Sequence, residues 1–225
     1  YAIRPLLSVK YLLNRKDGES FVDEDTHETH MSGYSYLKTD SGYYIYENEN
    51  YIPYGFSYNY YMSYDFCNGY NETSRPNLML KAILLTDEQI EKYGHLMENI
   101  EYIPLAATLE EDTTTLSLSD EALEIDCKNL STTSAYYFKK DNNGFTAKVE
   151  RDSESLVFFS IPYDKGWSAT VNGTETEIEK VNAGFMAVKV GAGNSEIRFT
   201  YMTPGLLNGI KITTVLVLVM TVVSY

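Results

Sequence analysis

Short apolar runs separated by polar turns fill the second half of the chain and predict β-strands. Residues 156–161 (LVFFSI) are continuously apolar, as in a strand covered on both faces, and residues 185–190 alternate as a half-buried strand does. The Asn172-Gly173 pair predicts a hairpin turn, because both residues tolerate positive φ. The predicted strands lie at 116–118, 123–127, 135–138, 145–150, 156–161, 168–171, 175–181, 185–190 and 196–201. Regular short strands with such turns favour an antiparallel β-sandwich.

The first hundred residues show a mixed pattern of strands and helices. Apolar runs at 9–14 and 43–47 predict strands, and the acidic stretch at 17–42 predicts a long loop. A helix is predicted at 77–85. It is followed by Thr86 with Gln89 three positions later, the spacing of a capping box that starts a helix from 87 to about 97. The fold class predicted for the whole chain is therefore α+β, a mixed α/β N-terminal part followed by the sandwich.

The last twenty residues form the most apolar segment of the chain. The run from 210 to 223 (IKITTVLVLVMTVV) nearly reaches the roughly 20 apolar residues of a spanning helix when counted from 206. It predicts the start of a transmembrane helix, with the chain cut inside it and belonging to a longer protein; a buried C-terminal helix or strand is the alternative. The predicted domains are an α/β part at 1–104, an antiparallel sandwich at 105–204 and the transmembrane start at 205–225.

Charge and composition narrow the classes of partner. With 18 basic and 32 acidic residues the net charge is −14, which excludes a nucleic-acid-binding surface as the expected function. The 21 tyrosines suit either an exposed contact surface or half-buried strands. Cys67 and Cys127 lack a metal-binding or redox motif, so a disulfide and two free thiols both remain open. His27 and His30 lie in an acidic stretch that reads as a solvated loop; no metal and no cofactor are expected.

The candidate binding residues fall in two aromatic stretches. In the first, Asp164 and Lys165 are predicted to form a tight turn, with Gly166 supplying positive φ. Trp167 then either seals the core or offers its ring to a sugar, whose C–H face is apolar, with Asp164 as a partner for hydroxyl groups. The second is the aromatic stretch at 51–64, for which two interpretations remain open, a glycan-contact strip and a packing face of the sheet. The candidate substrate-binding residues are Tyr163, Asp164, Lys165, Trp167, Tyr58 and Tyr60.

The same C-terminal motif carries a resemblance to a known family. A strand, PYDKGW, a hairpin with an Asn-Gly turn, an apolar strand and then Tyr-x-x-Pro-Gly before an apolar segment resemble the end of the YfhO family of bacterial polytopic membrane proteins. The segments SVKYLLN at 8–14 and YENENYIPYGF at 46–56 are similar too. The matching residues of the motif are Pro162, Tyr163, Asp164, Lys165, Gly166, Trp167, Asn172, Gly173, Gly193, Tyr201, Pro204 and Gly205.

The resemblance implies a multi-spanning glycosyltransferase of the C-type fold in the bacterial cell membrane. Such a protein is expected to move a sugar from a polyprenyl-phosphate donor to a cell-envelope polymer such as lipoteichoic acid. This chain would be its extracytoplasmic domain, positioning acceptor or donor, with the C-terminal segment in the lipid bilayer. The catalytic acid is expected outside this chain, so no catalytic residue is assigned here. The alternatives are a non-catalytic glycan-binding module and a structural scaffolding domain.

Overall fold

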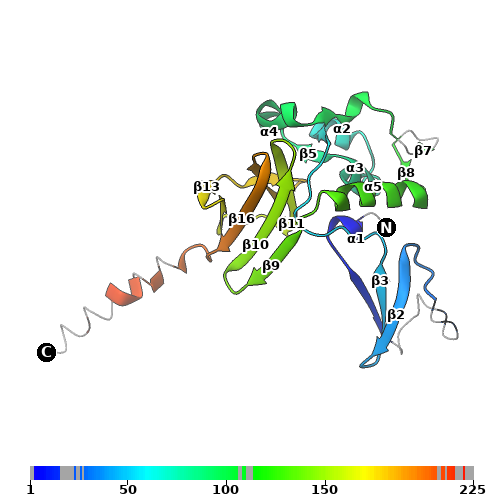
Figure 1. The fold of residues 1–225 in the computed structure, drawn as a ribbon, viewed down its shortest axis with the longest axis horizontal. Helices are drawn as coiled ribbons and strands as arrows, with labels where there is room; N and C mark the ends of the chain where they lie inside the picture. Colours follow the sequence, from blue (N-terminus) through cyan, green and yellow to red (C-terminus); the bar gives the residue numbers. More distant parts are fainter. Residues whose placement is uncertain are drawn as a thin grey trace.

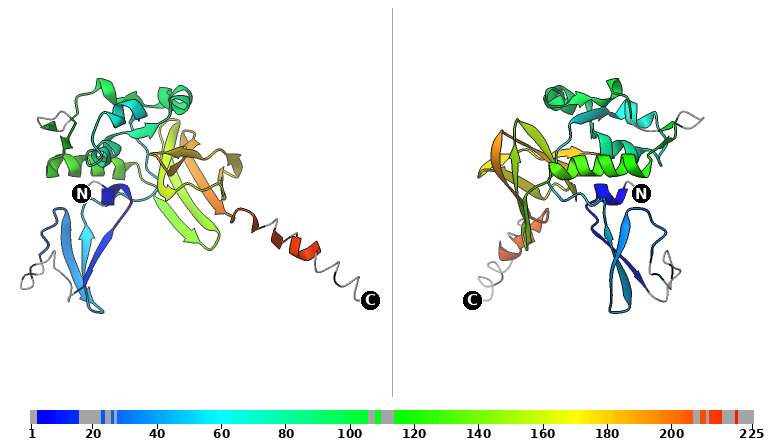
Figure 2. Two further views of the ribbon diagram at one scale, coloured as in Figure 1. Left: turned by 180° about the vertical axis from the view of Figure 1, so that it is seen from behind. Right: turned by 45° about the vertical axis from the view of Figure 1, so that its right-hand side comes forward.

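The fold combines a small α/β part with several antiparallel sheets, two of which form the C-terminal half. The computed structural model describes residues 3–15, 23, 26, 28–105, 108–109, 114–206, 209–210, 212–215 and 220. Figure 1 shows an N-terminal three-stranded sheet that projects from the body, and a C-terminal segment that leaves the opposite side; Figure 2 confirms both from other directions.

The projecting sheet is antiparallel and has the strand order β1-β3-β2. It follows a single helical turn, α1 (Ile3–Leu6), and consists of β1 (Tyr11–Arg15), β2 (Tyr34–Asp40) and β3 (Tyr43–Asn48). The prediction of strands near 9–14 and 43–47 is confirmed. The predicted loop at 17–42 is wrong over β2, because β2 pairs with β3 along most of its length. Residues 16–22 lie outside the described residues.

The next part of the chain builds a small sheet with parallel pairing, in the order β5-β4-β6, surrounded by short helices. The elements are β4 (Tyr60–Ser63), α2 (Tyr64–Asn68), α3 (Arg75–Lys81), β5 (Ile83–Leu85), α4 (Asp87–Tyr93), η1 (Gly94–Leu96), β6 (Glu98–Asn99) and η2 (Ile100–Tyr102). The capping box is confirmed, since Thr86 accepts from the backbone N–H of Gln89 and the Gln89 side chain accepts in return. The helix ends at Tyr93, earlier than predicted. The helix predicted at 77–85 gives way to β5 after Lys81.

The C-terminal part contains two antiparallel sheets, as the sandwich prediction requires. One sheet has the order β13-β12-β16-β10-β9 and the other β11-β15-β14. Their strands are β9 (Tyr137–Asp141), β10 (Gly144–Arg151), β11 (Ser155–Pro162), β12 (Trp167–Val171), β13 (Thr174–Thr176), β14 (Glu179–Val181), β15 (Phe185–Val190) and β16 (Gly193–Tyr201). The hairpin turn between β12 and β13 is confirmed, with φ of 53° at Asn172 and 79° at Gly173.

One predicted strand is wrong: residues 123–127 belong to the helix α5 (Asp120–Thr132). The Ser119 hydroxyl accepts from the backbone N–H of Ala122 and caps the helix. The buried residues Leu123, Cys127 and Leu130 then recur at steps of four and three, the spacing of one helix face. Two short strands, β7 (Thr108–Leu109) and β8 (Leu116–Ser117), pair just before this helix.

The middle sheet β11-β15-β14 is covered on both sides. One face packs on the larger sheet in a core that contains Phe145, Phe159 and Phe199. The opposite face supplies Phe158 and Ala187 to a second core that also includes residues of α1, β5 and α5. Because both faces of β11 are buried, its sequence is continuously apolar, as predicted.

A buried carboxylate joins α4 to the edge strand β14. Glu179, 8% exposed, accepts hydrogen bonds from Tyr93 Oη at 2.6 Å and from Gln89 Nε2 and Lys92 Nζ, each at 2.8 Å. Burial raises the pKa of Glu179, but the hydrogen bonds from Lys92, Tyr93 and Gln89 outweigh it and lower the pKa below its usual value. The folded protein therefore stabilises the charged form of Glu179.

This carboxylate is expected to stabilise the fold above the pKa of an unfolded glutamate and to lose that effect as the pH falls through its lower folded pKa. At pH 7, Glu179→Gln should cost about 1–3 kcal/mol of unfolding free energy, because a neutral amide leaves donors unsatisfied. The difference between the two proteins should shrink between about pH 5 and pH 3. Urea unfolding of both proteins across that range measures it; a difference that does not change with pH would contradict the assignment.

The C-terminal segment exposes apolar side chains. Leu206, Ile210, Ile212, Val215 and Met220 are between 51% and 69% exposed. Thr213 and Thr214 donate their hydroxyl groups to backbone carbonyls four residues earlier, as in a helix. No helix within the described residues is long and apolar enough to cross a bilayer, so the structure does not support the predicted transmembrane start. Residues 207–208, 211, 216–219 and 221–225 of that segment lie outside the described residues.

Candidate functional site

The PYDKGW stretch forms a tight corner between β11 and β12, as predicted. The Asp164 carboxylate accepts from the backbone N–H of Gly166 at 2.8 Å, and its carbonyl accepts from the N–H of Trp167 at 3.0 Å. The corner is tied to its neighbours by a hydrogen bond from the Tyr163 N–H to the carbonyl of Gly184 at 2.8 Å. Asp164 is thus oriented by the turn itself.

Gly166 is required for a different reason from the one predicted. It is absent from the residues with positive φ, so the prediction of a left-handed glycine is wrong. The Gly166 carbonyl accepts from the N–H of Met202 at 2.9 Å, and a Cβ at Gly166 would lie 2.5 Å from the Met202 carbonyl oxygen. The close approach of these two backbone segments excludes a larger side chain.

Trp167 combines the two roles that the sequence left open. Its ring is half-buried and packs against the core through Phe145 and Phe199, with ring centroids 5.8 and 6.2 Å apart. A third neighbour, Tyr201, lies across the strand pair at 4.9 Å. The remaining part of the indole faces solvent and forms one wall of a cleft.

The cleft has a volume of about 590 Å³, within the range of sites for small ligands. It lies at the end of the larger sheet where β9 turns into β10 and where β16 ends. Tyr54 stacks on Phe138 in its wall, with centroids 4.7 Å apart and planes 22° apart. The lining residues are Tyr54, Phe138, Lys140, Asp141, Asn142, Asn143, Gly144, Phe145, Ile161, Pro162, Asp164, Trp167 and Tyr201. Aromatic and aliphatic groups thus make the walls, and the β9–β10 turn contributes polar groups.

In that turn, the side chain of Asp141 is held in place by hydrogen bonds, whereas the side chains of Asn142 and Asn143 are not. Asp141 accepts two hydrogen bonds from Arg198, one from Nη1 to Oδ2 and one from Nη2 to Oδ1 at 3.1 Å, and a third from the backbone N–H of Asn143 at 2.8 Å. The Arg198 hydrogen bond is the main cause that lowers the pKa of Asp141 to about 2, so this carboxylate is charged at neutral pH. The side-chain amides of Asn142 and Asn143 are exposed and have no hydrogen-bond partner within the described part of the chain.

The structure brings together only part of the predicted set. Asp164 and Trp167 line the cleft, whereas Lys165 lines an adjoining hollow on the other side of Trp167. Tyr163 is 39% exposed beside the cleft but does not line it. Tyr58 is 5% exposed and donates its hydroxyl to the carbonyl of Met79, so its ring serves the core.

Tyr60 lies in a separate pocket, and several residues of the cleft were missed. Tyr54, Phe138 and Tyr201 were not among the candidates, although each lies in or beside a predicted strand or aromatic run. The turn sequence DNNG at 141–144 was the available signal for Asp141 and the two amides, because such clusters mark exposed turns.

Neither cysteines nor histidines form a site in the described part of the chain. Cys67 and Cys127 are both buried free thiols, and burial raises the pKa of Cys127 to about 12, which keeps it protonated and unreactive. The described residues contain no group of three or more His, Cys, Asp or Glu side chains arranged to hold a metal. His27 lies outside the described residues.

Comparison with known proteins confirms the family resemblance. Residues 107–213 match the family described as bacterial membrane protein YfhO. The chain is 31% identical over 64 residues to a Bacillus subtilis (strain 168) protein named "Uncharacterized protein YfhO", a match covering 28% of this chain and 7% of that protein. The chain therefore spans only a small part of the curated relative it matches. No solved structure matches. The family match includes every cleft residue except Tyr54.

Proposed function

We propose that this chain, which belongs to the YfhO family of bacterial membrane proteins, is an extracytoplasmic domain whose Trp167 cleft binds a sugar unit of a cell-envelope glycan. The observation that carries the proposal is the composition of the cleft. Trp167, Tyr54 and Tyr201 give flat apolar surfaces, and Asp141, Asp164 and the two free amides lie among them. A sugar ring likewise combines apolar C–H faces, which would pack on the aromatic rings, with hydroxyl groups at its edge, which would bond to the polar groups.

The polar groups of the cleft suit hydroxyl groups in particular. A hydroxyl both donates and accepts, so it can donate to a carboxylate and accept from an amide N–H. Asp141 stays charged at neutral pH, which gives it the stronger, charge-assisted hydrogen bonds. Lys140 is the one basic residue among the lining residues, so a neutral sugar fits better than an anionic one.

The place of the cleft supports a role next to a membrane. Tyr201 lines the cleft and ends β16, and the exposed apolar side chains of Leu206, Ile210 and Ile212 follow within eleven residues. We infer that these side chains contact the lipid bilayer, which would hold the cleft near the membrane surface. Figure 1 shows the described parts of this segment leading away from the sheet.

For the whole protein we propose a multi-spanning glycosyltransferase of the C-type fold. It would transfer a sugar from a polyprenyl-phosphate donor to an envelope polymer such as lipoteichoic acid, and this domain would position acceptor or donor. The catalytic residues would lie in the membrane part outside this chain. Because the net charge is −14, contact with a polyphosphate polymer should need divalent cations or partly neutralised chains. Equal binding of such a polymer in EDTA would contradict that requirement.

The cleft is tested with the 225-residue chain in detergent micelles, titrated with neutral envelope sugars by calorimetry. We expect saturable binding that Trp167→Ala weakens at least about fivefold, because packing on an aromatic ring is worth about 1 kcal/mol. Trp167→Phe should retain most of the affinity, since it keeps a flat ring. Tyr102→Ala, at a side chain that is 84% exposed and away from the cleft, is the matched control.

Each result of this experiment has a clear meaning. In the intact protein, the fluorescence of Trp167, the single tryptophan, should change with the same midpoint as the heat signal. A thermal unfolding curve of Trp167→Ala shows whether the fold is retained. Absence of binding at the cleft, seen as no change in Trp167 fluorescence and no loss of binding in Trp167→Ala, would favour a scaffolding domain that only supports its membrane protein.

A further inference from the structure

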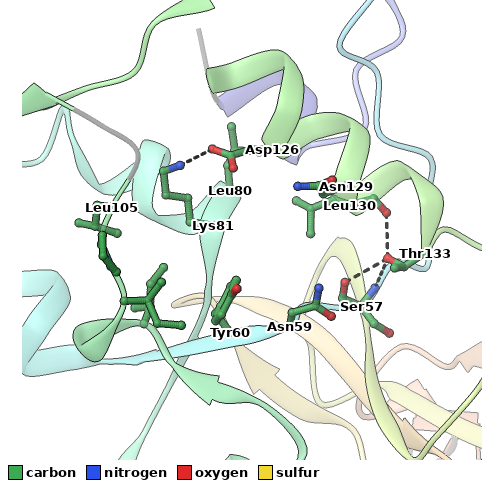
Figure 3. A pocket seen from close by; sticks show the side chains of 13 residues that line it. Ser57, Asn59, Tyr60, Leu80, Lys81, Leu105, Asp126, Asn129, Leu130 and Thr133 are labelled. Atoms are coloured by element: carbon green, nitrogen blue, oxygen red, sulfur yellow. Dashed lines mark hydrogen bonds and ion pairs between the residues drawn. The ribbon is translucent and has the colours of Figure 1, made fainter. Parts of the chain in front are cut away.

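A second, smaller pocket lies between β4, α3, α5 and η2, away from the Trp167 cleft. Its volume is about 200 Å³, and it shares no lining residue with the cleft. Figure 3 shows Lys81 and Asp126 on one side, with Asn59 and Tyr60 opposite them.

The polar side of this pocket is a buried ion pair with unused hydrogen-bonding capacity. Lys81 Nζ lies 2.6 Å from Asp126 Oδ2, and the two side chains are only 8% and 16% exposed. Apolar residues of similar volume would stabilise such a position at least as well, so stability alone does not account for the pair. Within the described residues, this contact uses one of the three donors of Lys81 and one oxygen of Asp126, which leaves donors and an acceptor side by side.

Two side-chain amides flank the pair. Asn59 precedes β4 and Asn129 is on α5, one turn after Asp126; neither side chain has a hydrogen-bond partner in the part of the chain that the structure describes. Figure 3 shows both at the pocket, without bonds to its other side chains. Ser57 and Thr133 are different, because each is already bonded to the other and to neighbouring groups. The groups available to a ligand are therefore the ion pair, the two amides and the phenol of Tyr60.

The rest of the lining fixes the size and polarity of the ligand. Six apolar residues, Leu80, Ile100, Ile103, Pro104, Leu105 and Leu130, line the pocket. A cavity of roughly 150 Å³ holds one benzene ring, so this pocket accepts one substituted six-membered ring and is too small for two. The ligand must present an apolar surface to these residues and several hydrogen-bonding groups to the ion pair and amides.

The charge of the ligand follows from the ion pair. An anion that accepts from the free donors of Lys81 would lie against the like-charged Asp126, and a cation that binds the free oxygen of Asp126 would lie against Lys81. A zwitterion would lose the hydration of two charges to meet a pair that is already neutralised. Uncharged hydroxyl groups cost less to desolvate, and each one both accepts from Lys81 and donates to Asp126 or to an amide oxygen.

We propose that this pocket is a second binding site, which takes a single neutral, hydroxyl-rich six-membered ring such as one monosaccharide unit. The ring packs on the apolar side, and its hydroxyl groups bridge Lys81, Asp126, Asn59 and Asn129. The site is independent of the Trp167 cleft, since the two share no residue, and it holds whether or not the cleft binds a glycan.

The test uses the 225-residue chain in detergent micelles and ligand-observed NMR with D-glucose, D-galactose and N-acetyl-D-glucosamine. All titrations are run in the Trp167→Ala background, so that failure of the cleft and failure of this pocket are separate results. We expect saturable binding of at least one of these sugars. The double variant Asn59→Ala/Asn129→Ala should weaken it at least tenfold with an unchanged thermal midpoint, because both amides are exposed and unpartnered. Asn68→Ala, at another exposed asparagine, is the matched control and should leave binding unchanged.

Three outcomes would overturn the proposal. The first is the absence of saturable binding of all three sugars. The second is binding that the double variant leaves unchanged. The third is a preference for a charged probe, either glucose 6-phosphate or the zwitterion alanine, over the neutral sugars, because it would show that the ion pair opens to receive a charge.

Discussion

Replacing Phe158 by alanine is expected to lower the free energy of unfolding by about 3–5 kcal/mol, the cost of deleting a large side chain from a packed core. Phe158 is fully buried, and its ring lies 4.9 Å from that of Phe56 and 5.8 Å from that of Phe185. Its backbone N–H also donates to the carbonyl of Phe56 at 2.7 Å. The residue therefore joins β11 to a segment about a hundred positions earlier, and urea unfolding measures the loss.

The neighbouring residue gives a matched comparison. Phe159 is equally buried but points to the opposite face, where it packs on Phe145 and Phe199 between the two antiparallel sheets. Phe159→Ala should cost a similar amount. In hydrogen exchange, only Phe158→Ala should loosen α5, because Leu123 and Leu130 of that helix belong to the core of Phe158. Unchanged protection of α5 in Phe158→Ala would contradict this assignment.

Replacing Lys81 by methionine is expected to cost about 3–5 kcal/mol at neutral pH, because it leaves the Asp126 carboxylate buried without its partner. Burial already raises the pKa of Asp126, against the hydrogen bond and charge of Lys81 that lower it. Without Lys81, the pKa rises further. The loss should therefore be largest at pH 7 and smaller at an acidic pH, where the carboxyl takes up a proton.

A double variant tests the origin of this loss. Lys81→Met/Asp126→Leu removes both charges and should recover most of the stability, since apolar residues replace a buried pair at little cost. Lys128→Met changes an exposed lysine on the same helix as Asp126 and should alter stability by less than about 0.5 kcal/mol. Urea unfolding at both pH values compares the three proteins. A double variant no more stable than Lys81→Met would show that the loss comes from packing.

The sequence predicts elements well where a local rule determines them. The capping box at Thr86 and the turn at Asn172-Gly173 rest on neighbouring residues alone, and both are present. The helix α5 was missed because Ile125 lies between Leu123 and Cys127 and completes an alternating, strand-like pattern. In the structure Ile125 is 52% exposed and outside the buried face, so it does not contribute to the true helical spacing.

The candidate site was predictable only on the side built from adjacent residues. The corner at Asp164 and Trp167 follows from the motif and its turn chemistry. Tyr54 lies in the same cleft although it is distant from this corner in the sequence. Its carbonyl accepts from the N–H of Ala135 at 3.2 Å, and its ring stacks on Phe138. Such long-range contacts depend on how the sheets and the N-terminal part pack, which no local pattern shows.

The middle sheet, covered on both faces, has a practical consequence for dissecting this protein. A fragment limited to residues 107–213 would contain both antiparallel sheets, but the face that carries Phe158 and Ala187 would lose its partners from α1 and β5 and meet water. Exposed apolar sheet faces of this kind promote aggregation. The same cut removes Tyr54 from the cleft, so solubility and ligand binding would be lost together. The smallest useful fragment therefore begins well before the part of the chain that sequence comparison marks out.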